Sequence, residues 1–249
     1  MKTRVAAVVV GCLLAGGCSA IEQRFVSPER LDQGLVIILP GIEQAGPSAL
    51  AVREGLLQGG SDAALQIYYW GRPLPILGPL VNQVDVTGNR LAAQRVAQMI
   101  LNYQELHPDR PVYLVGHSGG GGMAVFAAEA LPPDRHVEGL VLLAASISKG
   151  YDLDKALSRC RRGVVNYYSK ADVALLVVGT SLFGNVDGVR GPAAGAAGFS
   201  KTPARLYQVE WKPSMLAAGN DGGHFGATAP SFVARHVANW VRGNGWSVK

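Results

Sequence analysis

The strongest chemical signature is the segment Gly116-His117-Ser118-Gly119-Gly120, which follows the apolar run Val112–Val115 and precedes a helical stretch, Met123–Leu131. A strand, a glycine-rich turn with one serine, and a helix together fit the G-x-S-x-G nucleophile elbow. Such a turn strains the backbone at the serine, so its neighbours must be small. The Ser118 hydroxyl then stands beside a helix N-terminus, where developing negative charge is stabilised. The pattern therefore predicts a serine nucleophile.

The same glycines allow a competing interpretation. Gly119, Gly121 and Ala124 match the dinucleotide-binding fingerprint, which also lies between a strand and a helix. That fingerprint needs an acidic residue at the end of the next strand, but Glu138 precedes the strand that ends at Leu143. The sequence also contains no G-x-x-x-x-G-K-[ST] motif. We therefore favour the nucleophile over a nucleotide site.

With this elbow the chain resembles the α/β-hydrolases of the serine esterase and lipase kind, and the likeness covers residues 35–242. In that family an acid and then a histidine follow the serine, on loops after later strands. The resemblance places the acid at Asp172, after the apolar run Val164–Tyr168. It places the general base at His224, in a glycine-rich loop before the last helix.

These assignments have alternatives. Asp172 could cap a helix that begins at Val173, because acidic residues are common at that position. Asp187 and Asp154 are weaker candidates for the acid, since neither directly follows a strand. Asp221 is close to His224 in sequence, but we expect it to shape the loop.

The resemblance also implies two backbone donors for the oxyanion. One is the N–H of Gly119, after the nucleophile, and the other is the N–H of Ile42, after the apolar run Leu35–Leu39. One such donor is typically worth roughly 3–4 kcal/mol in the transition state. Six apolar side chains could line an acyl pocket or could equally be core: Leu74, Ile76, Leu77, Leu80, Phe183 and Phe199.

Apolar runs and helical stretches alternate along the chain. Strands are expected at Leu35–Leu39, Leu65–Trp70, Val112–Val115, Leu140–Leu143, Val164–Tyr168 and Arg205–Val209, and helices at Pro47–Leu57, Leu91–Leu106 and Phe232–Val241. Strands separated by helices imply a parallel sheet covered on both faces. We expect an α/β-hydrolase fold with a mostly parallel sheet of about six strands, trimmed of the family's first strands. Since no long insertion follows Leu143, we also expect a fairly open site.

The first residues resemble a bacterial lipoprotein signal. Lys2 and Arg4 precede an apolar stretch that is too short to span a bilayer, and small residues lead to Cys18. We expect a signal peptide at 1–17, lipid on Cys18, a tether at 18–33 and the hydrolase domain at 34–249, held in the bacterial cell envelope. Cleavage before Cys12 and plain secretion or periplasmic export are the alternatives.

The charge and the cysteine content limit which binding partners and cofactors are expected. The chain has a formal net charge of +5 with scattered bases, and only Arg159, Arg161 and Arg162 cluster, as at a solvated helix end. We expect no nucleic-acid partner. No metal-ligand cluster is evident in the sequence, so we expect no cofactor. Once Cys18 is lipidated, Cys160 is left as an inert thiol without an internal disulfide.

Two functions remain. The first is hydrolysis of a small-molecule or lipid ester through an acyl-enzyme on Ser118, with His224 as base and Asp172 as its partner. The alternative is a membrane-anchored binding or scaffold protein that keeps the fold without the chemistry. Because every catalytic residue type is present in the family's order, we favour the hydrolase.

Overall fold

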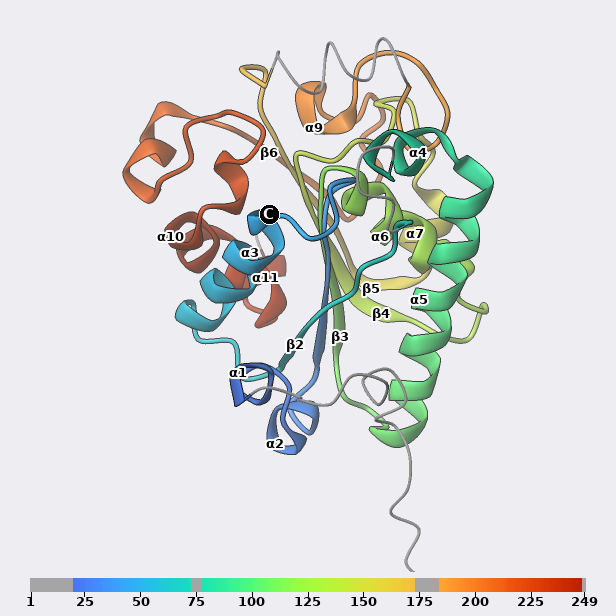
Figure 1. Ribbon diagram of the computed structural model, residues 1–249, viewed down its shortest axis with the longest axis vertical. Helices are drawn as coiled ribbons and strands as arrows, with labels where there is room; N and C mark the ends of the chain where they lie inside the picture. Colours follow the sequence, from blue (N-terminus) through green and yellow to red (C-terminus); the bar gives the residue numbers. More distant parts are fainter. Residues whose placement is uncertain (1–19, 73–77, 173–183, 248–249) are drawn as a thin grey trace, which may run out of the picture.

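Six strands form one parallel sheet in the computed structural model, which describes residues 20–72, 78–172 and 184–247 (Figure 1). Their bounds are β1 Leu35–Leu39, β2 Ala64–Ile67, β3 Val112–His117, β4 Val137–Leu143, β5 Cys160–Tyr168 and β6 Leu206–Glu210. They lie in the order β2-β1-β3-β4-β5-β6. Every residue of β1 and β3 is buried, as expected for parallel strands covered on both faces. The six expected strands are confirmed, with small shifts at their ends.

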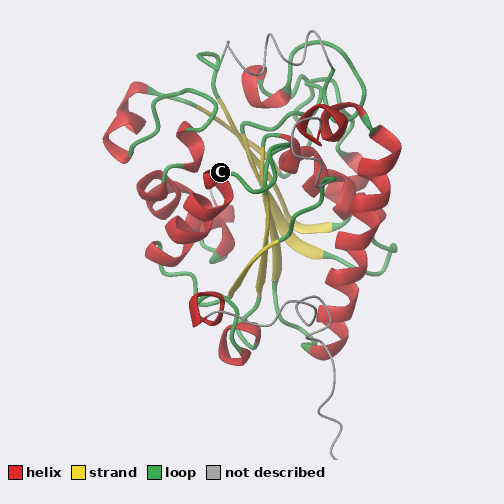
Figure 2. Ribbon diagram, in the orientation of Figure 1, coloured by secondary structure: helices red, strands yellow, loops and turns green. Residues whose placement is uncertain are grey.

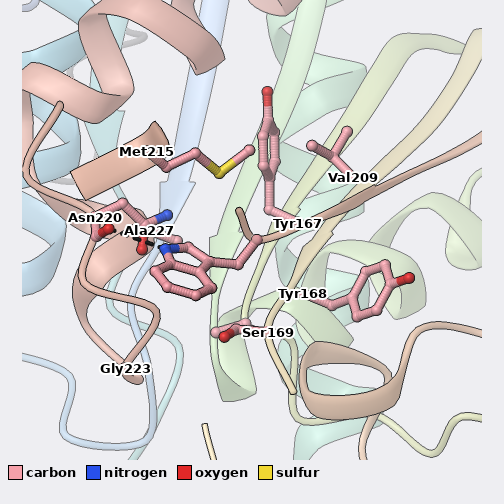
Figure 3. Close-up of a pocket in the computed structure, with 10 residues that line it drawn as sticks. Tyr167, Tyr168, Ser169, Val209, Met215, Asn220, Gly223 and Ala227 are labelled. Carbon is pink, nitrogen blue, oxygen red and sulfur yellow. Dashed lines mark hydrogen bonds between the residues drawn. The ribbon is translucent and has the colours of Figure 1, made fainter. Parts of the chain in front are cut away.

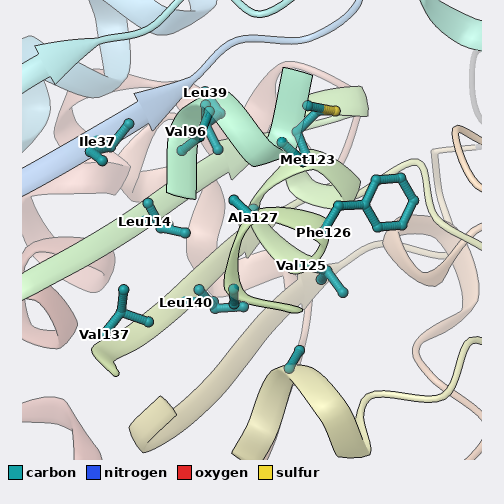
Figure 4. Packing of buried hydrophobic residues seen from close by; sticks show 14 of the residues in the cluster. Ile37, Leu39, Val96, Leu114, Met123, Val125, Phe126, Ala127, Val137 and Leu140 are labelled. Atoms are coloured by element: carbon teal, nitrogen blue, oxygen red, sulfur yellow. The ribbon is translucent and has the colours of Figure 1, made fainter. Parts of the chain in front are cut away.

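Helices cover both faces of the sheet (Figure 2). On one face lie α5 (Val86–Leu106), α6 (Gly119–Ala130) and α7 (Asp154–Ser158), and on the other lie α3 (Pro47–Gln58) and the C-terminal helical segments. Side chains alternate along a strand, so Ile37 and Leu39 pack toward α5 and α6. Val36 and Ile38 pack toward α3. Figure 4 shows the first of these two cores.

The helix expected at 232–241 is helical throughout, but it contains a π-helical turn. It consists of α10 (Pro230–Phe232), the π-helical turn η4 (Val233–Val237) and α11 (Ala238–Val241). The α3 helix lies very close to it, because a Cβ at Gly55 would lie 2.6 Å from Val233 Cβ, and one at Gly59 would lie 2.3 Å from Ala238 Cβ. Glycine at these two positions therefore allows the close contact. Val233 and Val237 of the π-helical turn are buried.

Residues 20–33 are folded against the domain, although the sequence suggested a tether. They contain α1 (Ala20–Gln23) and α2 (Pro28–Leu31). Phe25 is buried, and the Arg53 guanidinium lies 3.9 Å from the centre of its ring. Arg53 also donates to both Glu22 carboxylate oxygens at 2.9 Å. The buried aromatic ring and this ion pair fix the segment. The proposed signal peptide and Cys18 lie outside the described residues.

The remaining short elements are α4 (Gly78–Val84), α9 (Ala194–Ala197) and the 3₁₀ turns η2 (Pro213–Ala218), η3 (Gly226–Thr228) and η5 (Gly245–Ser247). Across the described ranges, no helix is long and apolar enough to cross a membrane. The strand order reverses between β1 and β3, because the chain passes from β1 outward to β2 and then back to β3. Ligand sites of open α/β sheets lie at such a reversal, beyond the carboxyl ends of the strands.

Candidate active site

Ser118 lies at this reversal, between the end of β3 and the start of α6. Its backbone angles are φ 52° and ψ −122°, a conformation that non-glycine residues rarely adopt. The Ser118 N–H donates to Leu143 O, and its carbonyl accepts from the N–H groups of Gly121 and Ser146, each at 2.9 Å. The main chain around Ser118 thus holds the strained conformation in place.

The glycines of the motif have a steric cause. A Cβ at Gly116 would lie 2.2 Å from the carbonyl oxygen of Gly120. A Cβ at Gly120 would lie 2.1 Å from the carbonyl oxygen of Leu39 in β1. Both obstacles are backbone atoms, so no rotamer change relieves them. The elbow can pack against β1 only with glycine at these positions.

The three residues predicted from the family order meet in space. His224 Nε2 lies 3.0 Å from Ser118 Oγ, and His224 Nδ1 lies 2.8 Å from Asp172 Oδ2. Asp172 is 3% exposed. Because the carboxylate only accepts, the proton of neutral His224 is placed on Nδ1, and Nε2 is free to accept from the serine hydroxyl. This is the arrangement in which a histidine can remove the serine proton.

The other acids have different partners. Asp187 accepts from the Ser148 hydroxyl at 2.5 Å and from its N–H at 3.2 Å, so it fixes a neighbouring loop. Asp154 begins α7. Asp221 accepts from the Gly223 N–H at 2.9 Å and shapes the loop before His224, as expected. Whether Asp172 also caps a helix is outside the described residues, because residues 173–183 are not described.

The loop after β1 lies directly against the elbow. A Cβ at Gly119 would lie 2.8 Å from Ile42 Cγ2 and 3.2 Å from Trp70 Cζ2. Gly119 is the first residue of α6, and the first N–H groups of a helix have no partner within it. The two expected oxyanion donors, Gly119 and Ile42, are therefore adjacent beside Ser118.

The Ser118 and His224 side chains are both largely buried. Ser118 is 6% exposed, and the His224 side chain is 9% exposed. The α4 helix and the segment that begins at Gly184 both contact Ser146, next to the elbow. Gln83 of α4 donates to Ser146 Oγ at 3.1 Å and to Gly184 O at 2.5 Å, and thereby joins the two parts.

Of the six residues expected to line an acyl pocket, only the Phe199 side chain is among the described residues. Leu74, Ile76, Leu77 and Phe183 lie outside the described residues, as does the side chain of Leu80. Phe199 is 5% exposed and belongs to the core on the α5 and α6 face. Phe199 therefore packs as a core residue.

His117, the variable residue of the elbow, has a role that the sequence reasoning missed. Its buried ring donates from Nε2 to the His224 carbonyl oxygen at 3.0 Å, and it lies 4.9 Å from the His224 ring. Burial, and then the nearby His224, lower the pKa of His117 to about 4. A neutral His117 therefore supports the main chain of His224. The sequence signal that could have indicated this role is a polar residue at the end of an otherwise apolar strand.

A small hollow lies beside the loop that carries His224 (Figure 3). Tyr167, Trp211, Met215 and Asn220 line it, and Trp211 Nε1 donates to the Asn220 carbonyl at 2.9 Å. No residue of the Ser118, His224 and Asp172 group lines this hollow. It is therefore separate from the Ser118 hydroxyl.

Cys160 is a free thiol in the core of the described structure. Burial raises the pKa of the Cys160 thiol to about 12, which fits an inert core cysteine. Among the residues whose positions are described, no three His, Cys, Asp or Glu side chains gather in a way that could hold a metal ion.

The alpha/beta hydrolase fold family model matches residues 63–181, a range that contains Ser118 and Asp172. No curated protein matches the sequence. Among solved structures, RedJ, a thioesterase from Streptomyces coelicolor, is 13% identical with a TM-score of 0.50, over 86% of this chain and 93% of that chain. Carboxyl esterase 2 from the fungus Tuber melanosporum is 10% identical with a TM-score of 0.49, over 85% and 79% of the two chains.

Dienelactone hydrolase from Anabaena variabilis is 16% identical with a TM-score of 0.49, over 85% of this chain and 86% of that chain. Identities this low carry no conclusion about function. The sheet order, the elbow after β3 and the family match agree, and the chain has the α/β-hydrolase fold.

Proposed function

We propose that the protein is a serine hydrolase that cleaves carboxylic esters. The observation that carries this proposal is the chain of hydrogen bonds from Ser118 Oγ through His224 to the buried carboxylate of Asp172. A serine hydroxyl is a weak nucleophile until a positioned base removes its proton. Here the serine is presented on a strained turn, with a base at hydrogen-bond distance and an acid that orients the base.

The reaction proceeds in two halves. Ser118 Oγ attacks the ester carbonyl carbon while His224 Nε2 accepts the hydroxyl proton. The N–H groups of Gly119 and Ile42 stabilise the tetrahedral oxyanion. The ester C–O bond then breaks, the alcohol leaves with the proton from His224, and the acyl group stays on Ser118. Water, deprotonated by His224, attacks the acyl-enzyme and releases the acid.

The test uses the purified protein with p-nitrophenyl esters of increasing chain length, and with an anilide and a thioester as competing substrate classes. We expect ester hydrolysis and covalent labelling of Ser118 by a fluorophosphonate. Ser118→Ala should lose both, with a fall of several orders of magnitude in rate. Ser158→Ala removes an exposed hydroxyl on α7 and serves as the matched control. A wild type that neither hydrolyses esters nor takes the label would leave the binding-protein alternative.

The acid assignment has its own test. Asp172→Asn should lower kcat by about 10³–10⁴-fold, because an amide favours the wrong histidine tautomer. Asp187→Asn should change kcat little, because Asp187 bonds Ser148. A larger loss of kcat in Asp187→Asn than in Asp172→Asn would contradict the assignment.

We further propose that lipid on Cys18 holds the mature chain to a membrane. The α1 helix begins shortly after Cys18 and lies at the end of the sheet opposite α4 and α9 (Figure 1). An anchor there would leave the catalytic edge facing away from the membrane. Cys18→Ser, expressed in a bacterium, should move from the membrane to the soluble fraction. Identical partitioning of the two proteins, without an acyl adduct by mass spectrometry, would favour plain secretion.

A further inference from the structure

The loop after β1 is held by side-chain donors at three successive carbonyl groups. Trp70 Nε1 donates to Pro40 O at 2.8 Å. Gln44 Nε2 donates to Gly41 O at 3.0 Å, and Asn82 Nδ2, from α4, donates to Ile42 O at 3.0 Å. Gln44 lies within this loop, whereas Trp70 and Asn82 come from later parts of the chain. The shape of the loop therefore depends partly on side chains outside it.

The bond at Gly41 decides where the Ile42 N–H points. In a trans peptide the C=O of one residue and the N–H of the next point in opposite directions. The Gly41 carbonyl is directed at Gln44, since it accepts from both the side-chain amide and the main-chain N–H of Gln44 at 3.0 Å. The Ile42 N–H is therefore directed away from Gln44. Gln44 itself has φ 60°, a strained value for a non-glycine residue.

The same two amides also hold the chain after β2. Gln44 Oε1 accepts from the Gly71 N–H, and Asn82 Oδ1 accepts from the Arg72 N–H, both at 2.8 Å. A Cβ at Gly71 would lie 2.3 Å from Asn82 Nδ2 and 2.7 Å from Gln44 Cδ. Glycine at 71 therefore allows both amides to pack against this segment. Asn82 is 2% exposed, so its bonds are shielded from water.

Asn82 connects this arrangement to the elbow through α4. It belongs to α4, whose next residue, Gln83, bonds Ser146, and the Ser146 N–H in turn donates to the Ser118 carbonyl. Asn89 of α5 donates to the main-chain carbonyl of Asn82 at 2.8 Å. The position of α4 is thereby coupled to both the elbow and the loop after β1.

We propose that Gln44 and Asn82 are positioning residues for the oxyanion hole, and that Asn82 makes its geometry depend on the docking of α4. This inference rests on the proposed ester hydrolysis. The two amides do not touch the substrate in this proposal. They fix the peptide planes around Ile42 so that its N–H is oriented before the oxyanion forms, which matters because misplacement by about 1 Å can cost about 10²-fold in rate.

The test separates the two halves of each amide. Asn82→Asp retains the acceptor for Arg72 but loses the donor to Ile42 O, and Gln44→Glu retains the acceptor for Gly71 but loses the donor to Gly41 O. Asn82→Leu removes the donor without adding a charge. The matched control is Gln208→Glu, because Gln208 binds both the N–H and the carbonyl of Phe199 in the same way on β6.

We expect a fall of about 10–100-fold in kcat in the Asn82 and Gln44 variants, with KM changed by less than about threefold. The affinity for a boronic acid, which forms a tetrahedral adduct on the serine, should fall in parallel with kcat/KM. Amide hydrogen exchange in residues 40–46 should become faster. Gln208→Glu should retain kcat and the exchange rate of residues 40–46.

Three results would overturn the inference: kcat within about twofold of wild type, a loss of kcat equal to that in Gln208→Glu, or a change confined to KM. If wild type itself neither cleaves esters nor takes a fluorophosphonate, the proposed function fails. In that case, amide hydrogen exchange in residues 40–46 still tests whether Gln44 and Asn82 hold the loop. Unchanged exchange in residues 40–46 of Asn82→Asp would show that the amides do not hold the loop.

Discussion

The two loops beside the Ser118 hydroxyl are held in different ways. The elbow is fixed by main-chain bonds to Leu143, Gly121 and Ser146 and by glycines that allow it to pack against β1. The loop after β1 is fixed by side chains from other elements, chiefly Trp70 and Asn82. The first arrangement follows from a few adjacent residues. The second depends on residues that folding brings together.

This difference predicts different consequences of mutation. A change in the elbow should affect folding, because the elbow is part of the contact between β3, α6 and β1. A change in the side chains that hold the β1 loop should leave the fold intact and lower the rate.

Gly120→Ala should have the largest effect on stability. The added Cβ would lie 2.1 Å from Leu39 O and 2.3 Å from Pro40 O, and neither backbone atom can move without displacing β1. We expect a loss of about 3 kcal/mol or more in the free energy of unfolding, or failure to fold. Urea unfolding followed by circular dichroism measures this loss.

Gly150→Ala is the control for that prediction, because a Cβ at Gly150 meets no atom within 4 Å. It should leave the free energy of unfolding nearly unchanged. Equal stability of the two variants would show that the elbow tolerates a side chain, and the contrast between the loops would then fail.

The same contrast explains which features the sequence predicts. Apolar runs such as Leu35–Leu39 become buried strands because parallel strands are covered on both faces. The elbow is predictable because its steric requirements lie within five consecutive residues. The family order then identifies Asp172 and His224, which the structure brings to hydrogen-bond distance.

Other features have no comparable signal. Gln44 and Asn82 are ordinary amides whose role depends on packing between distant segments. The bonds of Gln83 in α4 to Ser146 and Gly184 likewise join residues far apart in the sequence. The π-helical turn at Val233–Val237 was missed because its apolar spacing fits a regular helix.

His117 should make stability depend on pH, with a smaller effect than Gly120→Ala. Its pKa in the folded protein is lowered to about 4, chiefly by burial and secondly by the nearby His224 ring. The hydrogen bond to the His224 carbonyl, and then Glu43 and Asp172, oppose this shift. The unfolded chain takes up a proton near pH ~6.5. Stability from this group is therefore complete above that pH and is lost as pH falls toward 4. We expect a loss of about 2–3 kcal/mol by pH ~4.5, since one pKa unit corresponds to about 1.4 kcal/mol.

His117→Gln isolates this contribution, because glutamine does not titrate and can donate to the His224 carbonyl. Urea unfolding of both proteins at pH ~7.5 and ~4.5 gives the difference, in which the other titrating groups cancel. The variant should lose less stability between the two pH values than the wild type. An identical loss in both proteins would mean that the buried His117 does not exclude the proton.

Trp70→Phe should have the smallest effect and is the most direct test of the contrast. It removes the donor to the buried Pro40 carbonyl and keeps an aromatic ring in the core. An unpaired buried carbonyl costs about 1–3 kcal/mol of stability. Because Pro40 is next to Gly41, we also expect kcat to fall by about 3–10-fold with little change in KM.

Trp246→Phe is the matched control, since Trp246 Nε1 donates to the Trp240 carbonyl at 2.7 Å and is also buried. Both variants should unfold at similarly lowered urea concentrations, and only Trp70→Phe should lose kcat. If both retain the wild-type kcat, a side chain that fixes the β1 loop does not set the rate. The elbow alone would then account for the geometry of the site, and the contrast between the two loops would concern stability only.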